Sequence, residues 1–523
     1  MRRQWYLGFG IVLLAIFLFF VMLHDTVWFL ALLIPLIVLW IYDLAQKKHT
    51  ILRNFPVLGH IRYLLEFFRP EIQQYFIAND EEERPFSREK RSIVYERAKN
   101  VRDTIPFGTE RNIEAIGYTW VLHSLAPKHA AEVEPRITVG GPDCKKPYNA
   151  SRLNISAMSF GALSPNAIMA LNKAAKIGGF AHNTGEGGLS PYHLQGGDVI
   201  FQIGTAYFGC RNDQGLFDEE EFSKEANRDE VKMIEIKLSQ GAKPSHGGIL
   251  PAAKLTEEIA KVRKVKMGHD VLSPPAHSAF DSPRGLLHFV KKLRDLTDGK
   301  PVGFKLCIGR KHEFLAICKA MLETNILPDF ITVDGAEGGT GAAPLEYTNH
   351  VGEPLEAGLI FAHNALVGIN VRDKIRIICS GKIVTGFHMV SKIALGADMC
   401  NSARGMMMAV GCVQSKQCNA NTCPTGVATQ NKRLQRGLVV DEKKHRAVNF
   451  HNNTVKSFLE MIGAMGFSNP SELTPDCVMR RISDEVVKPF SEIYEYLKPG
   501  QLLGKEIPIS FKSHWEKAHP DRF

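Results

Sequence analysis

Residues 330–344 read FITVDGAEGGTGAAP, a short apolar run that ends in a glycine-rich loop. β-Branched and aromatic residues in a run of this length indicate a buried strand, and the glycines that follow indicate a turn or loop at its end. Glycine-rich loops are common, so this loop alone does not predict a site. A strand of this kind is, however, a building unit of buried parallel sheets.

Seven further runs of this kind occur along the chain, and several are followed by helix-compatible stretches. In chain order the eight runs are LNISAMS (153–159), GFAHN (179–183), VIFQIG (199–204), MIEIKLS (233–239), VGFKLCI (302–308), FITVDG (330–335), IRIICSG (375–381) and DMCNSA (398–403). Near-continuous apolar strands with helices between them predict an α/β fold with a parallel sheet covered on both faces. Eight such units predict a (β/α)8 TIM barrel, and a doubly wound sheet is the structural alternative.

The unusual polar and glycine-rich segments follow these runs. SFGALS follows the first run, TGEGGLS the second, QGAKPSHGG the fourth and AEGGTGAAP the sixth. In a TIM barrel the loops after the strands carry the chemistry, so we expect these segments to share one end of the barrel. After the seventh and eighth runs, SGKIVTG (380–386) and SARG (402–405) offer backbone amides and the guanidinium of Arg404 to a phosphate.

Several single polar residues in or near these runs allow two interpretations. Lys305 lies inside VGFKLCI, where it either reaches past the strand end to solvent or neutralises an anion inside the barrel mouth; the second is favoured because strands rarely bury an unpaired lysine. Glu186, Gln240, Lys243 and Arg263 could all be surface residues. Two cations and an amide around one barrel mouth would nevertheless suit a dicarboxylate.

Three of the ten cysteines are clustered, in GCVQSKQCNANTCPTGVATQ (411–430). Cys412, Cys418 and Cys423 have the spacing C-x5-C-x4-C, and three thiolates can ligate the irons of an iron–sulfur cluster. Zinc would need a fourth ligand, and the downstream candidate, His451, is too far away to belong to the motif. The spacing favours an iron–sulfur cluster and leaves open both zinc and purely structural thiols.

Two apolar runs near the N-terminus, Trp5 to Leu23 and Val27 to Tyr42, are uncharged and separated only by HDT. Their lengths predict a transmembrane helical hairpin. The alternative, a cleaved signal peptide, is not favoured because no small-residue cleavage site follows the first run. Basic residues flank the pair on both sides. The sequence therefore predicts a multi-pass protein of the cell (inner) membrane whose catalytic domain is cytoplasmic.

The composition excludes some classes of function. The chain has 523 residues, of which 45% are apolar and 23% charged, as in ordinary globular proteins. Its 64 Lys and Arg and 55 Asp and Glu residues are interspersed and form no dominant basic block, so nucleic-acid binding is not expected. No strand-linked G-x-G-x-x-G with a downstream acid occurs, so no nicotinamide site is predicted.

Seven motifs together resemble, in order and spacing, the FMN-binding synthase domain of glutamate synthase, over about residues 148–467. They are ISAMSFGALSPNA, NTGEGG, IKLSQGAKPSHGGILPAAKLTEEIAKVR, LSPPAHSAF, FKL, DGAEGGTGAAPL and GCVQSKQCNANTCPTGVATQ. The N-terminal runs, with PVLGHIRYLLE and PFSREKRSIVYERAK, resemble the stand-alone, membrane-tethered branch of that family. A collinear set of seven motifs is highly specific.

The resemblance implies two cofactors, FMN in the barrel and a [3Fe-4S] cluster on Cys412, Cys418 and Cys423. It also implies that 2-oxoglutarate is held by Gln240, Lys243 and Arg263, and that Glu186 faces the ammonia entry. The implied flavin-contacting positions are Ser156, Ala157, Met158, Ser159, Gln202 and Lys305. The implied ribityl and phosphate positions are Gly338, Gly339, Thr340, Gly341, Gly381 and Arg404.

The implied reaction is reductive amination of 2-oxoglutarate to L-glutamate, with electrons from ferredoxin or another donor passing through the cluster to FMN. The nitrogen could come from free ammonium, from a separate glutaminase subunit, or from another amine such as methylamine, which would give N-methylglutamate. One alternative is a membrane-bound flavin and iron–sulfur electron-transfer subunit. Another is an FMN-dependent hydroxy-acid oxidase or isomerase, which shares the barrel but does not require the three cysteines.

The sequence departs from the family pattern in two places. The large synthases begin with a glutaminase whose nucleophile is an N-terminal cysteine, whereas this chain begins Met1-Arg2-Arg3, so no glutaminase domain is expected. The phosphate segment reads SGK and NSARG where the large enzymes are richer in glycine, so Arg404 would replace backbone amides there.

The predicted domains follow from these assignments. They are two transmembrane helices (1–45), a mixed, partly helical adaptor (46–147), the FMN-binding barrel with its iron–sulfur loop (148–435) and a C-terminal helical extension (436–523).

Overall fold

The computed structural model describes residues 14–15, 17–19, 26–101 and 104–523. The chain divides into two compact units, Met1–Arg88 and Glu89–Phe523. The domain boundaries predicted at residues 45, 147 and 435 stay a prediction.

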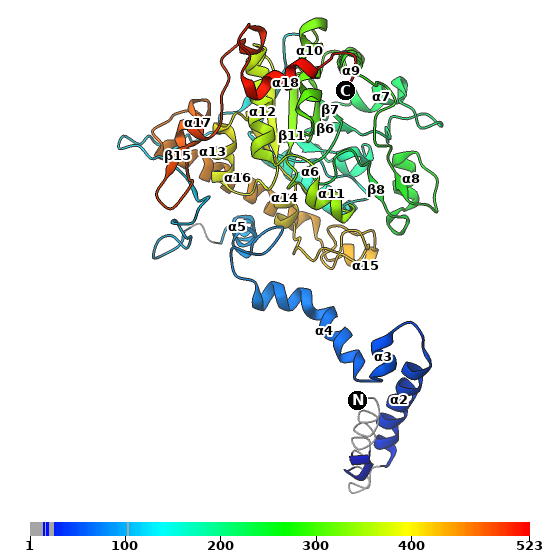
Figure 1. The fold of residues 1–523 in the computed structure, drawn as a ribbon. Coiled ribbons are helices and arrows are strands. Elements are labelled where there is room, and N and C mark those ends of the chain that lie inside the picture. Colours follow the sequence, from blue (N-terminus) through cyan, green and yellow to red (C-terminus); the bar gives the residue numbers. More distant parts are fainter. Residues whose placement is uncertain (1–13, 16, 20–25, 102–103) are drawn as a thin grey trace. The chain divides into compact units, whose positions relative to one another are not determined.

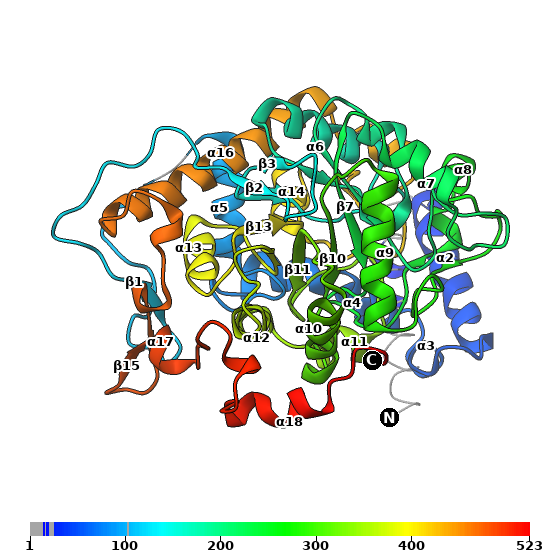
Figure 2. The same ribbon diagram turned by 90° about the horizontal axis from the view of Figure 1, so that it is seen from above.

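Eight parallel strands close into a barrel in the larger unit (Figures 1 and 2). The strands are β4 (Leu153–Ile155), β5 (His182–Asn183), β6 (Val199–Ile203), β7 (Val231–Lys237), β10 (Val302–Leu306), β11 (Phe330–Asp334), β12 (Arg376–Ser380) and β13 (Met399–Ser402). The last strand pairs with the first, Cys400 opposite Leu153 and Ser402 opposite Ile155, and this pairing closes the sheet. The eight predicted runs match the eight strands in order, so the TIM barrel is confirmed and the doubly wound alternative is wrong.

The barrel strands are apolar along their whole length because both of their faces are covered. Ile200, Met233, Ile378 and Met399 belong to one buried cluster inside the barrel. Alternate residues of the same strands, such as Phe201 and Ile377, belong to a second, larger cluster between the strands and the surrounding helices. The strand sequences therefore lack the polar and apolar alternation of a half-exposed sheet.

Helices surround the strands in both views (Figures 1 and 2). They are α6 (Pro165–Gly178), α7 (Glu219–Ala226), α9 (Pro283–Leu296), α10 (Lys311–Thr324), α12 (Leu355–Gly368) and α13 (Gly386–Ala394). Four of them begin at a side-chain cap, in which Ser164, Asp218, Ser282 or Thr385 accepts a hydrogen bond from the first turn. The connection from β5 to β6 instead contains two short 3₁₀ turns, Gly185–Gly187 and Pro191–His193.

Shorter elements and the long helix α16 complete the unit. The helices are α5 (Arg88–Lys99), α8 (Glu257–Arg263), α11 (Leu345–His350), α14 (Arg404–Ala409), α15 (Lys432–Gln435), α16 (Val440–Ala464), α17 (Phe490–Ile493) and α18 (Ile509–Lys517). The remaining strands form three antiparallel groups: β1 (Thr119–Val121) with β14 (Val478–Arg481) and β15 (Val487–Pro489), β2 (Ile137–Val139) with β3 (Tyr148–Ala150), and β8 (Ile249–Leu250) with β9 (Val271–Leu272). Val139, Tyr148 and Ala150 pack on the interior cluster of the barrel. Because β3 directly precedes β4, this hairpin covers the amino-terminal end of the barrel.

The smaller unit contains α2 (Thr26–Ala45), α3 (Thr50–Asn54), α4 (Gly59–Ile72) and a π-helical turn (Gln73–Ile77). The C-terminal turn of α2 carries Asp43, which is fully buried. Its carboxylate accepts hydrogen bonds from Val57 N at 2.8 Å and from His60 Nε2 at 3.0 Å. A buried charged group therefore joins α2 to the segment that leads into α4.

The structure does not support the predicted transmembrane hairpin, and it contradicts the predicted membrane localisation. The first predicted span, residues 5–23, lies for the most part outside the described residues, and the second coincides with α2. Among the residues that the structure describes, no helix is both long enough and apolar enough to cross a membrane. The end of α2 is anchored within its own unit, because the fully buried carboxylate of Asp43 accepts hydrogen bonds from Val57 N and His60 Nε2.

A buried ion pair holds the amino-terminal end of two barrel strands. The Asp329 carboxylate is fully buried, precedes β11, and accepts hydrogen bonds from Gly141 N at 2.6 Å and Val302 N at 2.8 Å. Arg294 of α9 donates to it from Nε at 3.1 Å and from Nη2 at 2.9 Å. One carboxylate thus ties together a helix, the start of β10 and the loop between β2 and β3.

We expect Arg294→Met to lower the free energy of unfolding by about 3–5 kcal/mol, because it leaves the buried Asp329 charge without its partner. The matched control is Lys291→Met on the same helix. Lys291 forms an exposed pair with Asp295 one turn away, and its loss should cost less than about 0.5 kcal/mol. Denaturant unfolding monitored by circular dichroism measures both; equal losses would contradict the assignment.

Candidate active site at the carboxyl end of the barrel

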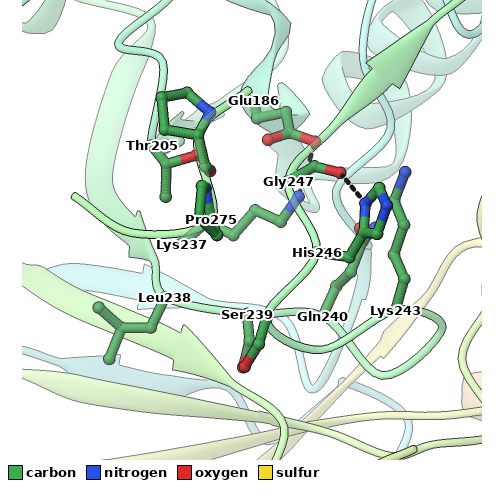
Figure 3. A pocket seen from close by; sticks show the side chains of 12 residues that line it. Glu186, Thr205, Lys237, Leu238, Ser239, Gln240, Lys243, His246, Gly247 and Pro275 are labelled. Atoms are coloured by element: carbon green, nitrogen blue, oxygen red, sulfur yellow. Dashed lines mark hydrogen bonds and ion pairs between the residues drawn. The ribbon is translucent and has the colours of Figure 1, made fainter. Parts of the chain in front are cut away.

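A pocket of about 270 Å³ lies at the carboxyl end of β7 (Figure 3). Its walls come from the turn after β5, the end of β6, the loop after β7 and the segment after β9. The lining residues are Glu186, Thr205, Lys237, Leu238, Ser239, Gln240, Lys243, Ser245, His246, Gly247, Pro274 and Pro275. Three of the four residues predicted to be catalytic, Glu186, Gln240 and Lys243, therefore meet in one pocket.

A short ion pair crosses the pocket. Lys237, the last residue of β7, donates from Nζ to Glu186 Oε1 at 2.6 Å (Figure 3). Glu186 lies in the 3₁₀ turn that replaces a helix after β5, and Gly185 enters that turn with φ of +65°. A β-carbon at Gly185 would lie 2.7 Å from Ser159 N, so the close approach of the two backbones requires glycine. The GEGG motif thus places the carboxylate.

Several cations act on the Glu186 carboxylate. Burial by itself would raise the pKa of Glu186, but the charge and hydrogen bond of Lys237, followed by the charges of Arg263 and Lys243, outweigh it and lower the pKa below its usual value. Burial lowers the pKa of Lys243 to about 8, against the opposing effect of Glu186. This end of the barrel therefore holds more buried positive charge than one carboxylate neutralises.

The loop that carries Gln240 and Lys243 is fixed against the glycine-rich loop after β11. Gly241 N donates to Asp334 Oδ2 at 3.0 Å, and Lys243 Nζ donates to Ala342 O at 2.7 Å. A β-carbon at Gly241 would collide with the carbonyl of Gly335, so the two loops pack backbone to backbone. The lysine is 2% exposed, and its amine lies at the junction of the two loops.

Arg263, at the end of α8, does not line this pocket but lies close behind Glu186. Its Nη2 donates to Phe160 O at 3.0 Å and to Ser159 Oγ at 3.4 Å, and its guanidinium lies over the Phe208 ring, 5.0 Å from the centroid. Burial lowers the pKa of Arg263 to about 10, although Glu186 acts in the opposite direction. Its Nε is buried without a hydrogen-bond partner among the described residues.

Two of the predicted flavin-contacting residues belong to a polar network inside the barrel mouth. Lys305 of β10 lies 3.3 Å from Asp334 Oδ2, the carboxylate that also binds Gly241 N. Gln202 of β6 donates from Nε2 to Glu235 Oε1 at 2.6 Å. The same carboxylate, 1% exposed, accepts from Asn183 and Thr332, so neighbouring barrel strands each contribute a polar side chain.

The predicted segment 156–159 lies at the carboxyl end of β4. Ser156 N donates to Ser402 O at 3.1 Å, and its hydroxyl lies 3.3 Å from that of Ser380. Met158 and Ser159 form the wall against which Gly185 packs. Ala157 lies between these anchored residues and is partly exposed.

The predicted phosphate-binding residues come together on a neighbouring part of the rim. Arg404, at the start of α14, donates from Nη2 to Glu337 O at 2.6 Å, and a β-carbon on Gly339 would lie 2.8 Å from its Nε. A β-carbon on Gly381 would lie 3.3 Å from Glu337 Oε1. None of the described residues accepts a hydrogen bond from the backbone amides of Gly339, Thr340 or Gly341, all of which are exposed. Three exposed amides thus lie beside a guanidinium, an arrangement that suits an anion.

The three clustered cysteines lie on one loop that follows α14. Burial, with smaller contributions from the charges of Cys418 and Cys423, raises the pKa of Cys412 to about 11, so the three thiols lie within electrostatic reach of one another. Lys254, 2% exposed, donates from Nζ to the carbonyl oxygens of Ala162, Cys418 and Ala428. A buried ammonium group therefore lies beside the cysteine loop.

The zinc alternative receives no support. Both ring nitrogens of His451, the candidate fourth ligand, lie at hydrogen-bond distance from protein groups: Nε2 from Ser151 Oγ and Leu153 O, and Nδ1 from Asn452 Oδ1. In the described part of the chain, which includes all three cysteines, no three His, Cys, Asp or Glu residues form a group that could hold a metal ion.

The sequence reasoning missed four charged residues that complete the site: Lys237, Glu235, Asp334 and Lys254. Lys237 pairs in register with Lys305 on the adjacent strand, and both interrupt apolar runs. The signal that identified Lys305 was therefore also present in MIEIKLS, where it also marks Glu235. Lys254 does not interrupt any of the eight apolar runs, so its sequence context does not mark it as a site residue.

Comparison with known proteins places these motifs in a family. The family described as a conserved region in glutamate synthase matches residues 123–468. The glutamate synthase large subunit-like protein YerD of Bacillus subtilis (strain 168) is 38% identical over 496 residues, which cover 86% of this chain and 94% of that protein.

Other relatives are longer than the matched region. The archaeal-type glutamate synthase [NADPH] of Thermotoga neapolitana is 33% identical over 316 residues, which are 60% of this chain and 59% of that protein.

A solved structure of mandelate oxidase with (S)-2-phenylpropionate is similar over 76% of this chain and 98% of its own, with a TM-score of 0.42 and 13% identity. The barrel assignment rests on the strand register and not on this likeness.

We expect Glu186→Gln to lower the free energy of unfolding by about 1–3 kcal/mol at pH 7, because buried cations lose their counter-charge. Since the pKa of Glu186 in the folded protein lies below its usual 4.5, the contribution of the carboxylate is complete above that pH and is lost as the pH falls through the lowered pKa. The difference between the two proteins should therefore shrink below about pH 4.5.

Denaturant titrations across this pH range measure the effect, with Glu257→Gln as control because Glu257 is exposed. A difference that stays constant with pH would contradict the assigned ion pair.

Proposed function

Because the chain belongs to the glutamate synthase family, we propose that it is an FMN-dependent oxidoreductase that converts 2-oxoglutarate to L-glutamate by reductive amination. We further propose that electrons reach the flavin through a [3Fe-4S] cluster. The observation that carries the proposal is the pocket in which Glu186, Gln240 and Lys243 meet next to the polar mouth of the barrel.

The residues present fit FMN. The exposed amides of residues 339–341 and the Arg404 guanidinium form an anion cradle that suits its phosphate. Lys305 offers a buried cation near the mouth; burial alone would lower its pKa, but Asp334 and Glu235 raise it above its usual value, so the lysine is charged at neutral pH. Ser156 to Ser159 and Gln202 would contact the ring system, and Gly338 and Gly381 the ribityl chain.

The cysteine loop supplies the donor set of a [3Fe-4S] cluster: the three thiols do not converge on a single metal ion, but a cluster binds each thiolate through a different iron, and the thiols lie within electrostatic reach of one another. Cys412, Cys418 and Cys423 supply three thiol ligands on one loop, and the Lys254 ammonium lies beside them. Tyr95 fixes the start of the loop by donating from its hydroxyl to Cys412 O at 2.8 Å. When bound, the cluster would supply single electrons and FMN would supply the hydride that the reaction needs.

The chain's own residues would bind and orient the substrate. Two carboxylates of 2-oxoglutarate need cations. Lys243 and the Gln240 amide line the pocket, and Arg263, buried behind Glu186, would add a second positive charge from outside the pocket wall. Ammonia condenses with the 2-oxo group and releases water, and the imine then takes up a hydride and a proton. Glu186, held as a carboxylate by Lys237, would attract ammonium and accept its surplus proton.

Partners of the reaction follow from the same proposal. Ferredoxin or another one-electron donor would reduce the cluster, and ammonium, a separate glutaminase subunit or another amine would supply nitrogen. The chain spans 94% of the Bacillus relative but only 59% of the Thermotoga relative, whose name includes NADPH. The domains that this proposal assigns are the barrel with its cysteine loop, residues 148–435, between the adaptor region and the C-terminal helical extension.

The test of the proposal is reoxidation of the reduced holoenzyme. The protein, purified with flavin and cluster, is reduced anaerobically and mixed with 2-oxoglutarate plus ammonium, methylamine or glutamine while flavin absorbance is followed. We expect rapid reoxidation with 2-oxoglutarate and one of these nitrogen sources. If reoxidation is fastest with methylamine, the enzyme is an N-methylglutamate synthase. No reoxidation with any of them would contradict the synthase proposal and favour an electron-transfer subunit.

Lys243→Ala should raise the KM for 2-oxoglutarate about 10- to 100-fold, because a charge-assisted contact to a carboxylate contributes about 1.5–3 kcal/mol. The flavin spectrum should not change, since Lys243 is not among the proposed flavin contacts. The control is Lys261→Ala, an exposed lysine of α8. Loss of flavin from Lys243→Ala would mean that its role has been misassigned.

Cys418→Ser should remove the cluster and leave the flavin bound, because the thiolate is a proposed iron ligand and Cys418 lies outside the proposed flavin-binding residues. Iron content, flavin content and the electron paramagnetic resonance spectrum of the oxidised protein measure this. Cys477→Ser, a change at a half-buried thiol elsewhere in the chain, is the control. Full cluster content in Cys418→Ser would exclude this cysteine as a ligand.

A further inference from the structure

Lys254 occupies an unusual position between three segments of the chain. It ends the 3₁₀ turn Ala252–Lys254 and is 2% exposed. Its Nζ donates to Ala162 O at 2.7 Å, Cys418 O at 3.1 Å and Ala428 O at 3.2 Å. One amine thus joins the loop after β4, the cysteine loop and the segment that follows the cysteines.

The number of acceptors identifies the charged form of the side chain. An ammonium group has three N–H donors, and each of them has one carbonyl acceptor here. In the described residues no carboxylate lies within ion-pair distance of this nitrogen, and Lys254 is not among the salt-bridged lysines. A buried cation that is balanced only by carbonyl dipoles is costly unless a negative charge lies nearby.

We propose that Lys254 is a positioning residue for the iron–sulfur cluster, which holds the cysteine loop on the barrel rim and stabilises the reduced cluster with its buried positive charge. This inference rests on the proposed function, since it requires the cluster on Cys412, Cys418 and Cys423. Each reduction adds one electron from the external donor and makes the cluster more negative by one unit. A fixed cation beside it therefore raises the reduction potential.

Other hydrogen bonds keep the cysteine loop in place when Lys254 is changed. Asn421 donates from Nδ2 to Ala253 O at 2.8 Å, and Gln430 donates from Nε2 to Gly161 O at 3.1 Å and Leu163 O at 2.9 Å. Ser164 N also donates to Val427 O. These bonds are neutral, so removing the lysine charge should change the electrostatics of the cluster more than the path of the loop.

The experiment measures the midpoint potential of the cluster in the holoenzyme of wild type, Lys254→Met, Lys254→Gln and Lys254→Arg. Each protein is titrated with dithionite and ferricyanide in the presence of mediators, and the cluster is followed by electron paramagnetic resonance. We expect the two neutral variants to shift to a more negative potential by at least a tenfold change in the ratio of reduced to oxidised cluster, about 59 mV for one electron. The arginine variant should stay near wild type.

Lys300→Met is the matched control. Lys300 is also buried and also donates only to carbonyl oxygens, those of Ala226 and Arg228, but these lie in the loop between α7 and β7. Its loss should cost stability without shifting the potential of the cluster. A shift of the same size in this control would overturn the proposal, because the effect would then follow from general loosening of the fold.

Three further outcomes of the same experiment also test the role of Lys254. A wild-type potential in Lys254→Met and Lys254→Gln would overturn the electrostatic role. Loss of the cluster from both neutral variants with retention in Lys254→Arg would support the proposal, because the charge would then be required to hold the loop; loss from all three would overturn it. Absence of a cluster from wild-type protein with bound flavin would instead contradict the proposed function itself.

Discussion

The structure depends on the pairing of β13 with β4, which closes eight parallel strands into a ring. Because all eight strands run in the same direction, their carboxyl ends share one rim, and every loop that follows a strand must start there. Segments separated by hundreds of residues consequently meet, as Lys243 does with Ala342 and Lys254 with Cys418. Apolar side chains fill part of the barrel interior, and the polar network around Glu235 lies inside the barrel mouth next to this rim.

A second constraint is electrostatic, because the rim buries several cations. Lys305 is neutralised by Asp334 and Lys237 by Glu186. Lys243 and Arg263 have no ion-pair partner of their own in the described part of the chain, and burial accordingly lowers the pKa of both. We expect such a surplus of buried positive charge to favour the binding of an anion at this rim.

The sequence predicted the barrel well because burial on both faces leaves a direct trace, a short run without polar alternation, and all eight runs became strands in order. Glu186, Gln240 and Lys243 were predicted from the resemblance of their motifs to the synthase family, since the residues by themselves allowed surface positions; that the three line one pocket is a finding of the structure. The sequence could not predict Lys254, whose importance depends on contacts with residues 162, 418 and 428 that only the closed ring brings together. The transmembrane prediction rested on the length and hydropathy of two apolar runs, and among the described residues no helix meets that requirement.

The short segment after β4 connects the parts of the proposed chemistry. Ser159 and Phe160 accept hydrogen bonds from Arg263, and Ala162, two residues further on, accepts one from Lys254. Arg263 and the loop that carries the cysteines are therefore held by one short segment, through the Ser159 hydroxyl and the carbonyl groups of Phe160 and Ala162. Gly185 packs on the same segment, where a β-carbon would lie 2.7 Å from Ser159 N. A displacement of this segment would therefore disturb both proposed centres.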